Sequence, residues 1–260
     1  MTRHLTLEGI ENFRDFGDYR TVGGRRLKEG RLYRSASHGR ATEADLGAIA
    51  ALNLAVIVDL RRGGERLRDP SRRHAGFAGV VIAHDESAPE EEEDGWQAHI
   101  RRSDLSEASF RRYMVDYYRD APFEPRHLDL FRRYFRALAK ADGPVLIHCA
   151  AGKDRTGILA ALTHHLARVH PDDILADYLL TNDPGRMARR MPILAQAIEE
   201  LAGRTPSEAA LRAAMGVEAD YLDTAFAAIA DRFGGVDAYL ERALGMDAGL
   251  RGAIEARLLD

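Results

Sequence analysis

The sequence predicts an α/β fold, a central and mostly parallel sheet flanked by helices, and two observations carry this prediction. Three short runs, 54–59, 79–83 and 144–148, are continuously apolar and rich in β-branched residues. Such runs are typical of parallel strands that are covered on both faces. Helical patterns separate the runs, as crossover connections between parallel strands require. At 260 residues the chain can bury one sizeable core, so we expect a single domain over 1–260.

The N-terminal half supplies the remaining elements of this core. Residues 31–35 form a shorter apolar run, which we expect as a fourth strand nearer an edge of the sheet. Thr42 followed by Asp45 is close to a capping box and predicts the start of a helix. Before the third long strand, Phe131, Tyr134, Phe135 and Leu138 lie at helical spacing on one face.

From residue 156 onward strand signals vanish, and the chain reads as a helical part, 171–260, packed on the core. Prolines and glycines divide this part into separate segments. We expect helices near 156–169, 172–180, 184–202, 206–215, 217–232 and 235–244.

The stretch 85–120 begins unlike the rest of the chain. Five consecutive acidic residues, 90–94, repel one another and resist packing. A mobile, solvated surface segment is the simpler interpretation. The alternative is a mobile lid, because this stretch follows a strand whose carboxyl end faces the expected site.

Composition narrows the class of protein. A net charge of −4 gives no reason to expect nucleic-acid binding, and a single cysteine forms no internal disulfide. No apolar run is long enough to cross a bilayer, and the N-terminus does not resemble a signal peptide. We therefore expect a cytoplasmic protein, with export by a signal-independent route left open. The sequence does not predict the oligomeric state.

The chemistry centres on residues 144–157, which contain that cysteine. Cys149 ends a strand, a short loop with Gly152 follows, and Arg155 stands where a helix begins. A helix N-terminus and a neighbouring cation both favour the thiolate, which is the nucleophilic form. The guanidinium of Arg155 can hold two oxygens of a phosphoryl group at once. We therefore predict Cys149 as a nucleophile and Arg155 as a catalytic group that binds phosphate.

The rest of the loop has expected roles around this pair. Backbone N–H groups of a curled loop form an anion-binding nest, and Gly152 permits the curl. We expect Thr156 to assist departure of the sulfur and His148 to organise the loop without transferring protons. The predicted phosphate-binding residues are Ala150, Ala151, Gly152, Lys153, Asp154, Arg155 and Thr156.

A general acid must deliver a proton to the leaving oxygen, and three aspartates compete for this role. Asp59 ends the most apolar strand at the sheet edge where sites form, and we favour it. Asp154, beside Arg155, is its main competitor, and Asp85 comes third. The alternative to an acid role is an ion pair with Arg61 for Asp59, and a purely structural role in the loop for Asp154.

Lys153 adds a second cation to the loop. It is either a solvated side chain or a ligand of the substrate. In the second case the site accepts substrates that carry more charge than phosphotyrosine.

The segment His148–Gly157 (HCAAGKDRTG) resembles the signature of the protein tyrosine phosphatases. It is most similar to their bacterial tyrosine and lipid phosphatase subfamily, of the mycobacterial B type, in which Lys and Asp precede the Arg. Five further segments are similar to that subfamily, in the same order: 12–17, 30–35, 58–61 with Glu65, 177–182 and 221–226. The chain lacks the Trp-Pro-Asp acid loop of many relatives, since Trp96 is followed by Gln97. The resemblance implies the phosphatase fold, often with a helical lid, and substrates that include phosphoserine, phosphothreonine and phosphoinositides.

Together these observations predict a phosphatase that needs no metal and no cofactor, because no cluster of side chains has metal-ligand spacing. Its partner is a phosphorylated protein or a phosphoinositide, and Arg14 and Asp15 are candidates to support the site. The alternatives are sulfur transfer of the rhodanese type, a non-catalytic phospho-ligand binding protein, and an inositol-phosphate phosphatase with little protein activity.

Overall fold

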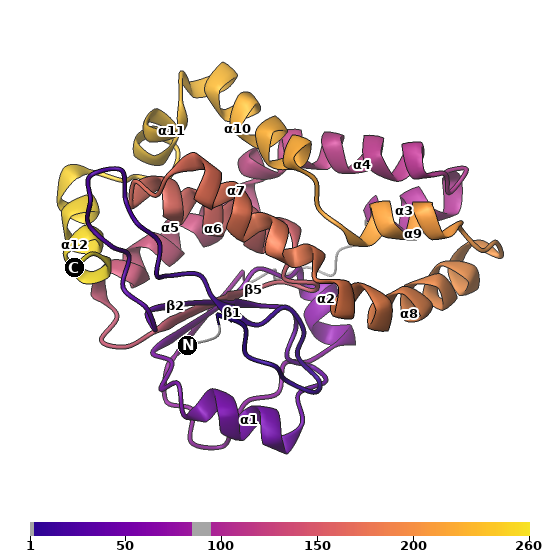
Figure 1. Ribbon diagram of the computed structural model, residues 1–260, viewed down its shortest axis with the longest axis horizontal. Helices are drawn as coiled ribbons and strands as arrows, with labels where there is room; N and C mark the ends of the chain where they lie inside the picture. Colours follow the sequence, from indigo (N-terminus) through magenta and orange to yellow (C-terminus); the bar gives the residue numbers. More distant parts are fainter. Residues whose placement is uncertain (1–2, 85–94) are drawn as a thin grey trace.

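A computed structural model describes residues 3–84 and 95–260. Within these residues a five-stranded sheet has the order β1-β2-β5-β3-β4 (Figure 1). The strands are β1 (Arg14–Asp15), β2 (Leu32–Ser35), β3 (Val56–Asp59), β4 (Val80–Ala83) and β5 (Val145–His148). Only the two-residue β1 runs antiparallel to its neighbour, so the predicted mostly parallel sheet is confirmed.

The register of the sheet brings three strand ends to one edge. His148 at the end of β5 lies between Ser35 of β2 and Asp59 of β3. Cys149 therefore leaves the sheet at the carboxyl edge of its central strand, where parallel sheets bind ligands.

The expectation that 79–83 is buried on both faces is wrong. β4 forms an edge of the sheet, and Val80 and Val81 are 59% and 37% exposed. An apolar run alone does not distinguish an edge strand from a central strand, because both have the same composition.

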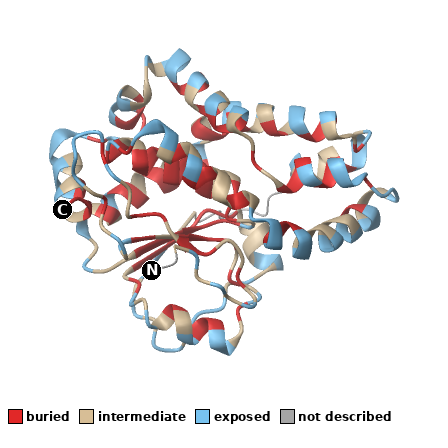
Figure 2. Ribbon diagram, in the orientation of Figure 1, coloured by how far each residue is buried: buried red, intermediate tan, exposed pale blue. Residues whose placement is uncertain are grey.

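Helices cover both faces of the sheet, with α5 and α6 on one side and α1 on the other (Figure 1). The helices in the described residues are α1 (Glu43–Ala50), α2 (Gly63–Arg68), α3 (Gly95–Arg102), α4 (Glu107–Asp120), α5 (Pro125–Lys140), α6 (Asp154–Leu166), α7 (Pro171–Leu179), α8 (Pro184–Ala202), α9 (Glu208–Met215), α10 (Ala219–Phe233), α11 (Val236–Arg242) and α12 (Ala248–Leu258). The side chains alternate as strand geometry demands. Val58 and Ile147 pack toward α5 and α6, whereas Ile57 and Leu146 pack toward α1. Figure 2 shows that buried residues concentrate in the strands and in α6.

The predicted helix at Thr42 begins as expected, since Thr42 and Asp45 form both hydrogen bonds of a capping box, at 3.2 and 3.0 Å. The six C-terminal helices expected from residue 156 onward are present with bounds shifted by up to three residues. Helix α12 is not among the helices expected from the sequence, and it contains Gly249 and Gly252, which have low helix propensity. It forms nevertheless, and it buries Ile254 and Leu258 against the core.

Helices α3, α4, α8 and α9 form a group with a small core of its own, beyond the end of β5 that carries Cys149 (Figure 1). Phe110, Ile198 and Leu211 are among its buried residues. Part of the stretch expected as a lid, 85–94, lies outside the described residues, and so does Asp85. The rest of that stretch forms α3 and α4.

Candidate active site

A cavity of about 280 Å³ opens over the loop between β5 and α6. The loop contributes Cys149, Ala150, Ala151, Lys153, Asp154 and Arg155 to its lining. Residues from the α3, α4, α8 and α9 group form the opposite wall. The structure thus places most of the predicted phosphate-binding residues around one cavity.

The loop turns its carbonyl groups outward to the scaffold. Ala150 O accepts a hydrogen bond from the Ser37 amide at 3.0 Å. Gly152 O accepts from Asn12 Nδ2 at 2.8 Å and from Arg34 Nη2 at 3.1 Å. By contrast, within residues 3–84 and 95–260 none of the backbone N–H groups of 150–156 donates to a protein acceptor. These N–H groups, together with the N-terminus of α6, can bind an oxyanion.

Gly152 has to be glycine at this point of the loop. Its φ is +64°, a left-handed conformation. A Cβ atom here would lie 2.5 Å from the carbonyl carbon and oxygen of Ser35. The loop therefore packs directly against the end of β2.

A buried ionic cluster supports the loop from behind. Arg34 and Arg14 contact Asp177 of α7 at 2.8 and 3.4 Å, and Arg34 also holds the Gly152 carbonyl. Burial alone would raise the pKa of Asp177, but the two guanidinium groups hold it well below its usual range. Of the two predicted supports, Arg14 joins this cluster, whereas Asp15 binds the Gly17 and Gly30 amides away from the loop.

Arg155 is fixed by a carboxylate that lies 90 residues earlier in the chain. Glu65 of α2 accepts both of its terminal nitrogens, at 2.5 and 2.8 Å. Burial alone would lower the pKa of Arg155, but the charge of Glu65 and its hydrogen bonds raise it well above its usual range. The guanidinium is thus permanently charged and held in one orientation beside Cys149.

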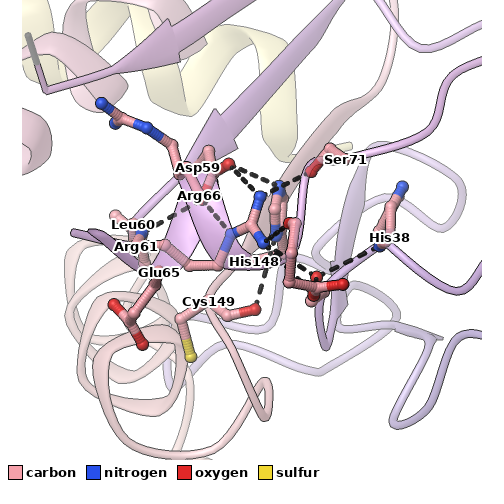
Figure 3. Close-up of polar contacts among 12 residues, drawn as sticks. His38, Asp59, Leu60, Arg61, Glu65, Arg66, Ser71, His148 and Cys149 are labelled. Carbon is pink, nitrogen blue, oxygen red and sulfur yellow. Dashed lines mark hydrogen bonds and ion pairs between the residues drawn. The ribbon is translucent and has the colours of Figure 1, made fainter. Parts of the chain in front are cut away.

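Cys149 is only 2% exposed, and Figure 3 shows its sulfur pointing away from Asp59. The His148 ring lies 3.4 Å from the Cys149 carbonyl oxygen and stacks on His38. Burial lowers the pKa of His148. The Thr156 hydroxyl is buried and has no hydrogen-bond partner in the described part of the chain, so it is not bonded to the sulfur in this state.

Asp59 does not line the cavity, although the sequence favoured it as the acid. Both of its oxygens are taken by the guanidinium of Arg61, at 2.9 and 2.8 Å (Figure 3). Burial alone would raise the pKa of Asp59, but His148 and Arg61 hold it well below its usual range. A carboxylate that stays ionised and faces away from the nucleophile is poorly placed to donate a proton.

Asp154, the competing candidate, lines the cavity together with Cys149. It stands in the first turn of α6, and its side chain is 22% exposed. Tyr118 of α4 donates a hydrogen bond to its Oδ1 at 2.9 Å. Geometry therefore favours Asp154 over Asp59 for proton transfer at the cavity.

Lys153 is not the solvated side chain of the simpler interpretation. Its ammonium is buried, donates to the carbonyl of Ala214 in α9 at 2.7 Å, and lies 3.6 Å from Asp154 Oδ1. Burial lowers the pKa of Lys153. Lys153 thus joins the loop to the helical group on the opposite wall.

Sequence reasoning missed most of that opposite wall. Trp96, Tyr113, Tyr117 and Met215 line it with apolar surface, and Arg190 of α8 lines it with charge. Glu65, which binds Arg155, belongs to one of the segments that resemble the phosphatase subfamily, but no local sequence pattern connects it with Arg155. The wall residues lie on amphipathic helices, where a cavity-facing side chain has the same pattern as a core side chain.

Among the described residues, no group of three or more His, Cys, Asp and Glu side chains is placed to hold a metal ion. The same residues include no helix with the length and apolar character needed to span a membrane.

Comparison with known proteins gives a consistent result. Residues 5–260 match a family model described as the tyrosine phosphatase family. A protein of Cupriavidus necator, provisionally named a tyrosine-protein phosphatase, is 36% identical over 96% of this chain and 88% of its own length. The triple specificity protein phosphatase PtpB of Mycobacterium tuberculosis is 33% identical over 97% of this chain and 96% of its own. A tyrosine-protein phosphatase of Nostoc commune is 32% identical over 57% of this chain and 47% of its own.

Proposed function

The chain belongs to the tyrosine phosphatase family, and on that premise we propose that it hydrolyses phosphomonoesters, foremost protein phosphotyrosine, through a cysteinyl-phosphate intermediate. One observation carries this proposal. Cys149 lies in a cavity beside Arg155 and beside a run of backbone N–H groups that have no acceptor among the residues that the structure describes. Such an arrangement binds a phosphoryl group and stabilises charge on its oxygens.

In the first step the Cys149 thiolate attacks phosphorus in line with the leaving oxygen. The S–P bond forms as the P–O bond breaks. Arg155 and the loop N–H groups bind the three equatorial oxygens, whose charge they stabilise without reorganising. Asp154 delivers its proton to the leaving oxygen, so that tyrosine departs as a neutral phenol.

In the second step a water molecule attacks the phosphocysteine. Asp154, now ionised, takes a proton from the water, the S–P bond breaks and phosphate is released. The Cys149 thiolate is regenerated, and no electron acceptor is needed. The same carboxyl group serves as acid and then as base because it lines the cavity from which both oxygens approach.

The assignment of the acid is tested by pH–rate profiles of Asp154→Asn and Asp59→Asn. We expect Asp154→Asn to lose about a hundredfold to ten-thousandfold in kcat and to lose the alkaline limb of the profile. Asp59→Asn is expected to retain that limb. The reverse pattern would return the role to Asp59.

The cavity also supports a broader substrate range. Besides Arg155 it is lined by Arg62, Arg126, Lys153, Arg186 and Arg190, against the carboxylates Glu65 and Asp154. This surplus of cations suits a phosphoester with additional negative charge. We therefore include phosphoserine, phosphothreonine and phosphoinositides as secondary substrates; the mycobacterial relative is itself named a triple specificity protein phosphatase.

Hydrolysis of a panel of phosphotyrosine peptides, phosphoserine peptides and phosphoinositides, without added metal, tests the function. Cys149→Ser is the control and should bind phosphopeptide without turning it over. Turnover of phosphoinositides alone would favour a lipid phosphatase. Binding without any turnover by the wild-type chain would identify a non-catalytic phospho-ligand binding protein.

A further inference from the structure

Two buried tyrosines form a hydrogen-bonded chain that ends on Asp154. The Tyr178 hydroxyl of α7 donates to the Tyr118 hydroxyl of α4 at 2.7 Å. The Tyr118 hydroxyl donates to Asp154 Oδ1 at 2.9 Å. Both rings are fully buried, at 0% and 1% exposure. Since each hydroxyl has one proton, an ionised Asp154 fixes the direction of the whole chain.

The two oxygens of Asp154 have different surroundings. Oδ1 accepts from Tyr118 and lies 3.6 Å from the Lys153 ammonium. No residue among 3–84 and 95–260 donates to Oδ2, although the side chain is partly exposed to the cavity. One oxygen is thus held by the protein, and the other is open to the substrate.

The tyrosines are suited to act as permanent donors. Burial first, and then the negative charge of Asp154, raises the pKa of both Tyr118 and Tyr178 well above the usual range. The phenols therefore keep their protons while Asp154 gains and loses one. Packing holds Tyr178 in place: its ring lies directly against Gly157, where a Cβ atom would clash with it.

We propose that Tyr118, backed by Tyr178, is the positioning residue of the general acid: its hydroxyl holds Oδ1 of Asp154, so that Oδ2 carries the proton to and from the substrate. The inference rests on the proposed role of Asp154. A hydroxyl donor stabilises the carboxylate more than the neutral acid. Tyr118 therefore holds the side chain in one rotamer and also favours the ionised form that the second step requires.

Other titratable or charged groups also lie near Asp154, and they contribute to the pH dependence of the rate in the wild type and in every variant. They are Cys149 and Lys153 of the loop, Tyr117 and Tyr118 of α4, Tyr178 of α7, Arg186 of α8 and Tyr221 of α10. Of these, only Tyr118 donates a hydrogen bond of normal length to the carboxylate among the described residues.

Tyr118→Phe tests the inference, because it removes the hydroxyl and keeps the ring. We expect the alkaline limb of the kcat profile to move up by about one pH unit, as loss of a hydrogen bond to a charged group implies. We also expect a loss of about tenfold in kcat for phenyl phosphate, whose leaving group needs the acid, and little loss for p-nitrophenyl phosphate, whose leaving group does not. Tyr178→Phe should shift the alkaline limb in the same direction and lower kcat for phenyl phosphate, with both changes smaller than in Tyr118→Phe.

Tyr221→Phe is the matched control. Its hydroxyl is buried and has no hydrogen-bond partner in the described part of the chain, and its ring lies 5.6 Å from that of Tyr118. Removing this hydroxyl should leave the profile in place. An equal shift in Tyr221→Phe and Tyr118→Phe would reduce the effect to general packing and overturn the inference.

A double variant separates this inference from the proposed function. If Tyr118 acts through Asp154, then Tyr118→Phe with Asp154→Asn should be no slower than Asp154→Asn alone. Fully multiplicative losses would overturn the positioning role while leaving Asp154 as the acid. If Asp154→Asn itself retains full rate and both limbs, the assignment of the acid fails, and the inference fails with it.

Discussion

Glu65→Gln is the substitution whose effect can be worked out most fully from the structure. The Glu65 carboxylate accepts both terminal nitrogens of Arg155, at 2.5 and 2.8 Å, and the Arg62 amide at 2.7 Å. Burial alone would raise the pKa of Glu65, but Arg155 and these hydrogen bonds lower it from 4.5 to about 2. A fall of about 2.5 in pKa, at about 1.4 kcal/mol per unit, corresponds to about 3 kcal/mol of folding stability.

The sign of the pH dependence follows from the direction of the change. Because the pKa of Glu65 is lower in the folded chain than in the unfolded one, its contribution is complete above pH 4.5 and is lost as the pH falls toward 2. We expect Glu65→Gln to lower the free energy of unfolding by about 3 kcal/mol at neutral pH, as removal of one partner of a buried pair does. The difference from wild type should shrink by about 2 kcal/mol as the pH approaches about 3.

Urea unfolding at several pH values measures both quantities. Glu208→Gln is a control, since its pair with Arg212 is exposed and should contribute less than about 0.5 kcal/mol. Kinetics should show a loss of up to about a hundredfold in kcat/KM, because Arg155 loses its orientation. A destabilisation below about 1 kcal/mol, or one independent of pH, would refute the argument.

Three further substitutions test other parts of the site. Gly152→Ala places a side chain on a left-handed residue and against β2, so it should lower the free energy of unfolding by at least about 2 kcal/mol and remove most of kcat. Gly203 is also left-handed but has open space around it, so Gly203→Ala should lower the free energy of unfolding by about 1 kcal/mol in urea unfolding and leave kcat unchanged. Asp59→Asn should lose about 3 kcal/mol of stability in the same assay, because its buried guanidinium partner keeps only the longer ion pair with Asp69, at 3.5 Å. Arg190→Gln should raise KM for a phosphopeptide about threefold to tenfold and weaken its salt dependence. Arg189→Gln, whose side chain is 66% exposed, should change neither, and equal effects of the two would contradict the role of the cavity arginine.

The loop around Cys149 could be predicted because its signals are local. An apolar strand, a glycine with left-handed φ and a helix start lie within about a dozen residues, and each follows from backbone preferences. The same is true of the helix that begins after Thr42, whose capping box lies within four residues. Local patterns of this kind need no knowledge of tertiary contacts.

The general acid could not be chosen by the same means. Asp59 and Asp154 both stand at promising positions, and only the fold decides between their partners. Arg61, two residues from Asp59, binds both oxygens of that carboxylate. Tyr118, 36 residues from Asp154, binds only one oxygen of Asp154 and leaves the other accessible. The exposed face of β4 was missed for a related reason, since strand order is set by contacts distant in the sequence.

The covalent intermediate gives the most direct test of the central claim. Asp154→Asn, which should lack the base for the second step, is mixed with p-nitrophenyl phosphate, whose leaving group needs no acid in the first step, and quenched with acid on the millisecond scale. Peptide mass spectrometry should find one phosphoryl group on Cys149, formed at a rate that accounts for turnover. Turnover without phosphocysteine, or a phosphoryl group on another residue, would contradict the account.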